Sequence, residues 1–340
     1  MNVNNAVRVG VLGAGRIGKI HARNLATLVP GAQVTAIADP ILDAACELAD
    51  QLHVPVATAD YQAVIRSPEV DAVAICSSTN THAQMMIEAA QAGKHIFCEK
   101  PIAYDLVKID EALAAVAKAG VLLQIGFNRR FDPNFKRLRD MVAAGKVGEA
   151  HILRITSRDP APPPISYVKV SGGIFFDMTI HDFDMSRYLM GSDVEEIYAE
   201  GGVLVDPAIG EAGDIDTAVV TLRFKNGAIG TIDNSRKAVY GYDQRAEVFG
   251  SGGMVQSQNI TPDSHIYSSA DGVHSEKPLY FFLERYTQSF LDEAKTFIDC
   301  VQQGRQPPVT GIDGRIPVVM AMAATRSVRE HRPVKLSEFR

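Results

Sequence analysis

The fold of the first half of the chain is decided by residues 7–18, which read Val7-Arg8-Val9-Gly10-Val11-Leu12-Gly13-Ala14-Gly15-Arg16-Ile17-Gly18. Residues 7–12 are rich in β-branched side chains and almost wholly apolar, which is typical of a strand buried on both faces of a parallel sheet. Three glycines follow at once, and a helical pattern then continues to about residue 28. A lone Gly-x-Gly-x-x-Gly carries little weight, but here the strand before it and the helix after it supply the context that the motif requires.

The glycine spacing predicts a dinucleotide site. Gly13 permits a tight turn, Gly15 lets a pyrophosphate approach the backbone, and Gly18 lets the helix pack closely on the strand. The N-terminus of the following helix favours the phosphate charge. Arg16 and Ile17 complete the turn, and we expect them to contact the cofactor as well.

Asp39 predicts that the dinucleotide is NAD. It ends the apolar run of residues 33–39 and lies about 20 residues past the glycines, as the dinucleotide fingerprint requires. Its carboxylate can accept hydrogen bonds from ribose hydroxyls but would repel a 2′-phosphate, and residues 40–42 bring no arginine to neutralise one. The alternative is that Asp39 only caps the helix that follows.

Strands and helices continue to alternate, which predicts an α/β Rossmann domain over residues 1–126. The expected strands lie near 54–57, 71–76, 95–99 and 121–126, and the expected helices lie near 41–52, 61–66, 82–92 and 107–119.

Polar residues follow the strand at 71–76, at the end of the sheet where ligands bind in folds of this kind. We expect Ser78, Thr79, Asn80 and His82 to contact cofactor phosphate or ribose. For each of them, capping or opening of the next helix is an equal alternative.

The strand at 95–99 ends in Glu99-Lys100-Pro101. A lysine at this position is a point charge with three donors, so Lys100 could bind a substrate hydroxyl and stabilise a developing alkoxide. We expect Glu99 and Lys100 to lie beside the cofactor. The alternative is a solvated Lys100 paired with Glu99.

The pattern changes in residues 127–340, which we expect to form a substrate-binding and oligomerisation domain. Several strands follow one another without intervening helices, which predicts an α+β domain with a large, mostly antiparallel open sheet. The uncovered face of such a sheet favours oligomerisation. The expected strands lie near 151–157, 195–204, 217–224, 228–235, 244–250 and 253–257. Two helices are expected after them, near 280–303 and 312–331.

Residues 172–184 place a carboxylate and an imidazole four residues apart, at Asp177 and His181. If the segment is helical, both lie on one face, and Asp184 shares that face. Three interpretations remain open on these residues alone: proton transfer by a histidine that a carboxylate orients, metal binding, and a helix N-terminal anion beside a half-buried histidine.

The totals exclude several classes of protein. A chain of 340 residues predicts two domains, and a net charge of -6 disfavours a general nucleic-acid role. No apolar run reaches membrane-spanning length, and the first residues do not have the pattern of a signal peptide. The four scattered cysteines have no zinc spacing, so we expect no metal, and thiols in a cytoplasmic protein.

The whole chain resembles the glucose–fructose oxidoreductase / inositol dehydrogenase family. The resemblance rests on the glycine turn, on Glu99-Lys100-Pro101, on Asp177-x-x-x-His181 and on Pro308-Val309-Thr310-Gly311-x-Asp313-Gly314. Within the family, residues 126–133 and 177–184 are most similar to the inositol dehydrogenases.

The resemblance implies oxidation of myo-inositol at C2 to 2-keto-myo-inositol, with NAD as acceptor, and a homotetramer assembled through the second domain's sheet. It implies that Lys100 orients the reacting hydroxyl, that His181 takes its proton and that Asp177 holds His181. The remaining substrate hydroxyls are then expected to contact Asn128 or Arg129, Asp159 and Tyr240.

Other functions remain open at this point. Phe176 stands where inositol dehydrogenases often have a basic residue, so another inositol isomer or an aldose is an alternative substrate. A non-catalytic NAD(H)-binding regulatory protein is an alternative of another class. A metal-dependent hydrolase would need further ligands at matching spacing, and His151, His265 and His274 lie in segments without one.

Overall fold

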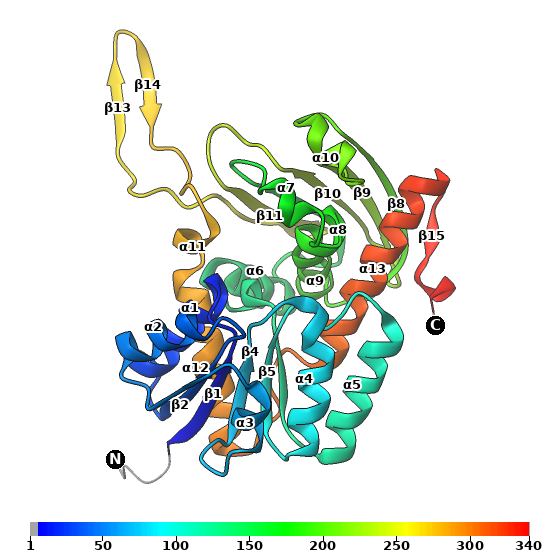
Figure 1. The fold of residues 1–340 in the computed structure, drawn as a ribbon. Helices are drawn as coiled ribbons and strands as arrows, with labels where there is room; N and C mark the ends of the chain where they lie inside the picture. The colour runs from blue at the N-terminus through cyan, green and yellow to red at the C-terminus, as the bar shows by residue number, and fades with distance from the viewer. Residues whose placement is uncertain (1–5, 340) are drawn as a thin grey trace. The chain divides into compact units, whose positions relative to one another are not determined.

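The computed structural model describes residues 6–339, which fold into two compact units (Figure 1). One unit contains the chain through Phe131 and also residues Gln288–Ile316, and the other contains Asp132–Thr287 and the chain from Pro317 onward. The chain therefore returns to its first unit late in the sequence, whereas the predicted division into 1–126 and 127–340 has a single crossing. Within the described residues, no helix is both long enough and apolar enough to cross a membrane.

The first unit contains a six-stranded sheet in the order β3-β2-β1-β4-β5-β6, and all of its neighbouring strands pair in parallel. This order, with its reversal between β1 and β4, is that of a dinucleotide-binding Rossmann sheet, so the predicted fold class is confirmed. The strands are β1 (Val7–Leu12), β2 (Ala32–Ala38), β3 (Val56–Thr58), β4 (Ala72–Ile75), β5 (His95–Glu99) and β6 (Leu123–Gly126).

A late helix completes the core of the first unit. Apolar side chains of β1, β2 and β4 pack with those of α1 and α2, and Ala294, Phe297 and Ile298 of α12 join the same cluster. These three residues recur at helical spacing, which places them on one face. The helices are α1 (Arg16–Thr27), α2 (Leu42–Leu52), α3 (Tyr61–Arg66), α4 (Thr79–Gln91), α5 (Leu106–Ala119), a 3₁₀ turn η2 (Asn128–Phe131) and α12 (Thr287–Gln303).

The second unit contains a seven-stranded sheet in the order β12-β11-β7-β10-β9-β8-β15. Its neighbours are antiparallel except for β7 and β10, which pair in parallel, so the prediction of a mostly antiparallel sheet is confirmed. The strands are β7 (Ala150–Arg158), β8 (Val194–Gly202), β9 (Thr217–Phe224), β10 (Ile229–Ser235), β11 (Asp243–Gly250), β12 (Gly253–Ser257) and β15 (Val334–Lys335).

One face of this sheet is covered and the other is not. Along β9 every second side chain is buried, while Val219 between them is 52% exposed. Ile229 on the adjacent strand β10 and Phe249 on β11 are also exposed. Helix α9 packs against β7 and β10. The helices of this unit are α6 (Pro133–Ala143), α7 (Ile165–Val168), α8 (Ile174–Asp177), α9 (Thr179–Met190), α10 (Pro207–Glu211) and α11 (Phe282–Arg285).

Three features differ from the sequence-based expectations. The strands β13 (Ile266–Ser269) and β14 (Gly272–Ser275) form a small hairpin that was not predicted. The single helix expected near 280–303 is divided at Tyr286 into α11 and α12. The helix α13 (Gly311–Glu330) contains Pro317, at which the chain passes from one unit to the other.

The glycine turn has the geometry that its spacing predicts. Gly13 has φ +110°, and a Cβ there would lie 2.7 Å from the Cys76 backbone. A Cβ on Gly18 would lie 1.9 Å from the carbonyl oxygen of Gly13, whereas one on Gly15 would have no heavy atom within 4 Å. The first and third glycines therefore let β1, β4 and α1 meet, and the second leaves open space.

These distances predict losses of stability of different size for two similar variants. Gly18→Ala should lower the free energy of unfolding by about 1–3 kcal/mol, because the turn must move to admit the methyl group. Gly15→Ala, the matched control, should cost less than about 1 kcal/mol. Urea unfolding followed by circular dichroism measures both, and equal losses would contradict the packing role of Gly18.

Candidate active site

Asp39 ties the glycine turn to the end of β2. Its Oδ2 accepts a hydrogen bond from the Ala14 amide at 2.7 Å, and its Oδ1 accepts one from the Ile41 amide at 2.9 Å. Each carboxylate oxygen has a second lone pair, so ribose hydroxyls can still bind. The contact with Ile41 is a local turn before α2, whose N-cap residue is Ile41 and has no side-chain cap, so the helix-capping alternative is not supported. The position beside Ala14 is the one that cofactor binding requires.

His82 lies inside the first unit. It is 1% exposed, its Nδ1 lies 2.8 Å from the carbonyl oxygen of Pro101, and its Nε2 lies 2.9 Å from that of Ser77. Burial lowers the pKa of His82 below its ordinary value. These contacts favour a structural link between two loops over side-chain contact with a cofactor. The other three residues predicted beside it open α4: Ser78, Thr79 and Asn80.

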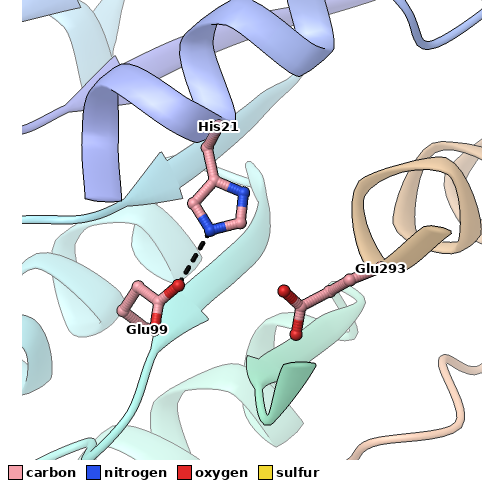
Figure 2. A group of neighbouring side chains, drawn as sticks. All are labelled: His21, Glu99 and Glu293. Carbon is pink, nitrogen blue, oxygen red and sulfur yellow. Dashed lines mark hydrogen bonds and ion pairs between the residues drawn. The ribbon is translucent and has the colours of Figure 1, made fainter. Parts of the chain in front are cut away.

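Glu99 and Lys100 follow one another at the carboxyl end of β5. Glu99 is half-buried, and its Oε1 lies 2.8 Å from Nε2 of the buried His21 (Figure 2). The peptide bond between Lys100 and Pro101 is cis. The contact of Lys100 with a substrate hydroxyl stays a prediction.

Asn128 and Arg129 belong to the first unit, although the predicted boundary placed them in the second domain. Both lie in η2 and are nearly inaccessible, at 4% and 5% exposure. The amide of Asn128 donates to the Ser289 hydroxyl at 3.4 Å. Their contact with substrate stays a prediction.

The segment that carries Asp177 and His181 is not one helix, as expected, but two. Asp177 is the last residue of α8 and His181 lies in the first turn of α9, with Met178 between them at φ -97° and ψ -61°. The hydroxyl of Thr179 lies 2.7 Å from Oδ1 of Asn234 on β10. This attachment to the sheet fixes the start of α9 separately from α8.

A buried arginine faces Asp177. Arg236 is 1% exposed, and its Nη1 donates to Oδ2 of Asp177 at 3.0 Å, while Tyr167 donates to Oδ1 at 2.7 Å. Arg236 Nη2 also lies 3.6 Å from Oδ2 of Asp214. Burial opposes the charge of Arg236, but Asp177, Asp159 and Asp214 outweigh it and raise its pKa. Arg236 therefore holds a permanent positive charge against Asp177.

The sequence analysis did not identify Arg236, Asp214 or Tyr167. Arg236 follows directly after the last residue of β10, and a charged residue at a strand end is the signal that could have identified it. Asp214 and Tyr167 lie in irregular segments, where no spacing reports on their neighbours.

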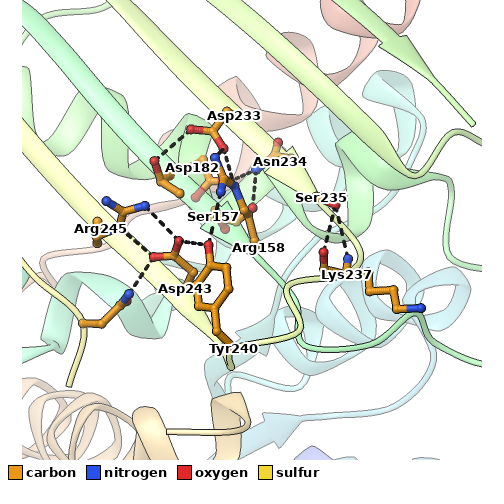
Figure 3. Close-up of polar contacts among 12 residues, drawn as sticks. Ser157, Arg158, Asp182, Asp233, Asn234, Ser235, Lys237, Tyr240, Asp243 and Arg245 are labelled. Atoms are coloured by element: carbon orange, nitrogen blue, oxygen red, sulfur yellow. Dashed lines mark hydrogen bonds and ion pairs between the residues drawn. The ribbon is translucent and has the colours of Figure 1, made fainter. Parts of the chain in front are cut away.

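Asp159 directly follows the last residue of β7. Tyr240 lies in the loop between β10 and β11 (Figure 3). The backbone N–H of Asp159 donates to the carbonyl of Ser235 at 2.9 Å, and its charge acts on Arg236. The Tyr240 hydroxyl donates to Asp243 Oδ2 at 2.5 Å and accepts from Arg158 Nη1 at 3.1 Å. Their contact with substrate hydroxyls stays a prediction.

The two acidic residues that follow His181 in α9, Asp182 and Asp184, are buried. Asp182 is fully buried and its Oδ2 accepts from the Asn234 amide at 2.9 Å, which pins α9 to the sheet (Figure 3). Asp184 is also buried, at 1% exposure, which favours a supporting role over contact with a polyol.

Comparison with known proteins finds relatives that match nearly the whole of this chain. Residues 7–127 match the model of an oxidoreductase family with an NAD-binding Rossmann fold, and residues 135–256 match the GFO/IDH/MocA C-terminal domain. The chain is 53% identical to a myo-inositol 2-dehydrogenase of Thermotoga maritima, over 98% of this chain and 99% of that protein. It is 38% identical to an NAD⁺-dependent scyllo-inositol 2-dehydrogenase of Bacillus subtilis, over 98% and 97%.

Solved structures of similar proteins have the same fold as this chain. A probable dehydrogenase from Thermotoga maritima has a TM-score of 0.96 at 53% identity, with 98% of this chain and 99% of that chain covered. A scyllo-inositol dehydrogenase from Lactobacillus casei, crystallised with NAD(H) and scyllo-inositol, has a TM-score of 0.92 at 28% identity, with the same shares covered.

The charge of Arg236 can be tested by stability. Arg236→Met should lower the free energy of unfolding by about 3–5 kcal/mol, because Asp177 and Asp214 lose their buried counter-charge. Arg236→Lys, which keeps the positive charge, should lower the free energy of unfolding by less. The double variant Arg236→Met/Asp214→Asn should lose less than the sum of its single variants, with a coupling of about 0.5–3 kcal/mol in urea unfolding. Equal losses in Arg236→Met and Arg236→Lys would contradict this account.

Proposed function

The chain belongs to the GFO/IDH/MocA family of oxidoreductases, and we propose that it is an NAD-dependent dehydrogenase that oxidises myo-inositol at C2 to 2-keto-myo-inositol. The observation that carries the proposal is the similarity to myo-inositol 2-dehydrogenase over 98% of this chain.

The first unit has the features that NAD requires. The space beside Gly15 is open, the N-terminus of α1 lies directly after it, and Asp39 stands beside the turn. Bound NAD supplies the acceptor for the hydride that leaves the alcohol carbon. The remaining residues of the proposed cofactor site are Gly13, Arg16, Ile17, Gly18, Ser78, Thr79, Asn80 and Glu99.

Lys100 and His181 handle the hydroxyl proton in this proposal. Removal of that proton needs a base that titrates near neutral pH, which is the property of an imidazole. His181 accepts the proton while Lys100 donates a hydrogen bond to the same oxygen and stabilises the negative charge that develops on it. The carbon–hydrogen bond breaks with its electron pair, and a ketone remains.

Asp177 has a positioning role in this mechanism. Arg236 binds one of its carboxylate oxygens and Tyr167 of α7 binds the other, which fixes the carboxylate at the end of α8. We infer that Asp177 in turn orients His181 and stabilises the imidazolium that forms. Asn128, Arg129, Asp159 and Tyr240 are the proposed contacts of the other substrate hydroxyls.

A second substrate has a specific observation in its favour. The chain is also similar over its full length to enzymes that act on scyllo-inositol, which differs from myo-inositol at the C2 hydroxyl alone. Both isomers give the same ketone at that carbon. A panel of inositol isomers and aldoses, followed by NADH absorbance, decides between them.

The protein is further proposed to act in the cytoplasm as a homotetramer that assembles through the open face of the second unit's sheet. The exposed apolar side chains Val219, Ile229 and Phe249 of this sheet support the proposal, because burying them between subunits would remove apolar surface from water.

The catalytic roles make a direct prediction. Lys100→Met and His181→Asn should each lower kcat for myo-inositol by about 10²–10⁴, because each removes a group that acts on the reacting oxygen. Both variants should still bind NADH, measured by its fluorescence. Near-normal turnover in both variants would contradict the mechanism.

The choice of cofactor is a separate prediction. Wild-type kcat/KM should be higher with NAD than with NADP, because Asp39 repels a 2′-phosphate.

The assembly can be tested by mass. Ile229→Glu should shift the species seen by light scattering to a smaller one, because a charge is then buried in the proposed interface. Val107→Glu on α5, a similarly exposed position in the first unit, is the matched control and should leave the mass unchanged. A wild-type monomer would contradict the proposal at once.

A further inference from the structure

Three titratable side chains meet inside the first unit: His21 from α1, Glu99 from the end of β5 and Glu293 from α12 (Figure 2). His21 and Glu293 are almost completely buried, at 1% and 0% exposure. One imidazole nitrogen and one oxygen of each carboxylate all lie within 4.8 Å of one another. The mechanism proposed above does not use His21 or Glu293.

The carboxylate of Glu293 is enclosed but has no hydrogen-bond partner among the described residues at either oxygen. It points toward the pair formed by His21 and Glu99 (Figure 2). An ionised carboxylate in such a place would be costly, since it has neither solvent nor a donor. Burial first, and then the nearby charge of Glu99, raise the pKa of Glu293 well above its ordinary value. Burial and the lack of a donor therefore favour the uncharged carboxylic acid form of Glu293.

The nearby thiols add no charge to this cluster. Burial raises the pKa of Cys76 and of Cys98 well above the ordinary value, so both remain neutral. Among the described residues, the titratable groups that lie near Glu293 or interact with its charge are His21, Glu99 and Cys76.

The surroundings also fix Glu99. The ring of His21 packs against the rings of Phe97 and Phe290, with 4.7 Å and 5.8 Å between the ring centroids. This packing holds its Nε2 toward Glu99. On the other side, a Cβ on Gly126 would lie 2.9 Å from Oε2 of Glu99, so glycine there leaves the room that the carboxylate occupies. Segments far apart in the sequence therefore converge on the residue that precedes Lys100.

We propose that His21 and Glu293 are positioning residues, which hold the Glu99 carboxylate and through it the Glu99–Lys100 turn in the geometry needed for hydride transfer. This inference rests on the proposed function of Lys100 and deepens it. A protonated Glu293 presents an O–H toward the Glu99 carboxylate, whereas an ionised Glu293 would repel it. One proton on Glu293 therefore keeps Glu99 in place.

A metal ion is the competing interpretation, because one imidazole and two carboxylates are ligands that Zn²⁺ uses. The hydrogen bond of 2.8 Å between His21 Nε2 and Glu99 Oε1 favours the proton, since it already occupies the imidazole nitrogen that faces both carboxylates.

The test compares Glu293→Gln with Glu293→Leu in the full-length enzyme. Glutamine keeps the shape of a neutral acid and an N–H donor, so kcat for myo-inositol should stay within about threefold of the wild type. Leucine fills the space without a donor, so Tm should be retained while kcat falls at least tenfold and the Kd for NADH rises at least threefold. A purely structural role would not separate kcat from Tm in this way. Glu293→Gln should therefore keep the kcat and the NADH affinity that Glu293→Leu loses.

The difference in Tm between the wild type and Glu293→Gln should also change with pH. Folded wild-type protein keeps a proton on Glu293 that the unfolded chain releases above the ordinary pKa of 4.5. The folded state is therefore progressively destabilised as the pH rises from there to the raised folded value. Glu293→Gln has no such group, so its Tm should gain on the wild type as the pH increases from 5 to 9.

Four results would overturn the proposal: a loss of kcat in Glu293→Gln as large as in Glu293→Leu, full activity in Glu293→Leu, a Tm difference that does not change with pH, or a Zn²⁺-dependent rise in Tm that Glu293→Gln abolishes. If the wild type oxidises no polyol, the proposed function fails, while the Kd for NADH and the pH dependence of Tm still decide the proposal about Glu293.

Discussion

The close approach of β1, β4 and α1 at the glycine turn is the constraint on which the rest of the first unit depends. A side chain at Gly13 or Gly18 would overlap the backbone that packs against it. Because nothing larger fits, α1 starts directly at the sheet, its N-terminus faces the open space at Gly15, and the Asp39 carboxylate reaches the Ala14 amide. One steric condition thus places the phosphate-binding end of the helix and the ribose-binding acid together.

Both units place an ionisable group in their interior, and the energetic cost of burying it is met in a different way in each. In the second unit Arg236 remains charged because two carboxylates lie within 3.0 Å and 3.6 Å of its guanidinium. In the first unit Glu293 has no such partner, and its burial favours the neutral form. Both arrangements adjoin a residue with a proposed catalytic role, Asp177 in one case and Lys100 in the other. Perturbed groups cluster at functional sites for this reason.

The division of Asp177 and His181 between two helices shows how tertiary contacts override a local pattern. A four-residue spacing places two side chains on one face only while the helix is continuous. Here Thr179 is held by Asn234 of β10, so α9 takes its position from the sheet and the chain turns at Met178. The pair was correctly identified as notable, but its geometry depends on a strand more than 50 residues later.

The sequence alone determined the alternation of strands and helices in the first unit, the glycine turn with its acid, and the consecutive strands of the second unit, because periodicity and glycine spacing are local properties of the chain. It also identified Lys100, Asp177 and His181 through their position at element ends and their resemblance to a family. Only the tertiary structure decided that α12 returns to the first unit, that Arg236 binds Asp177, that His82 is buried between two carbonyls, and that His21, Glu99 and Glu293 meet. These contacts join residues tens to hundreds of positions apart. No pattern within a window of sequence reports on such neighbours, because packing brings them together after the local elements have formed.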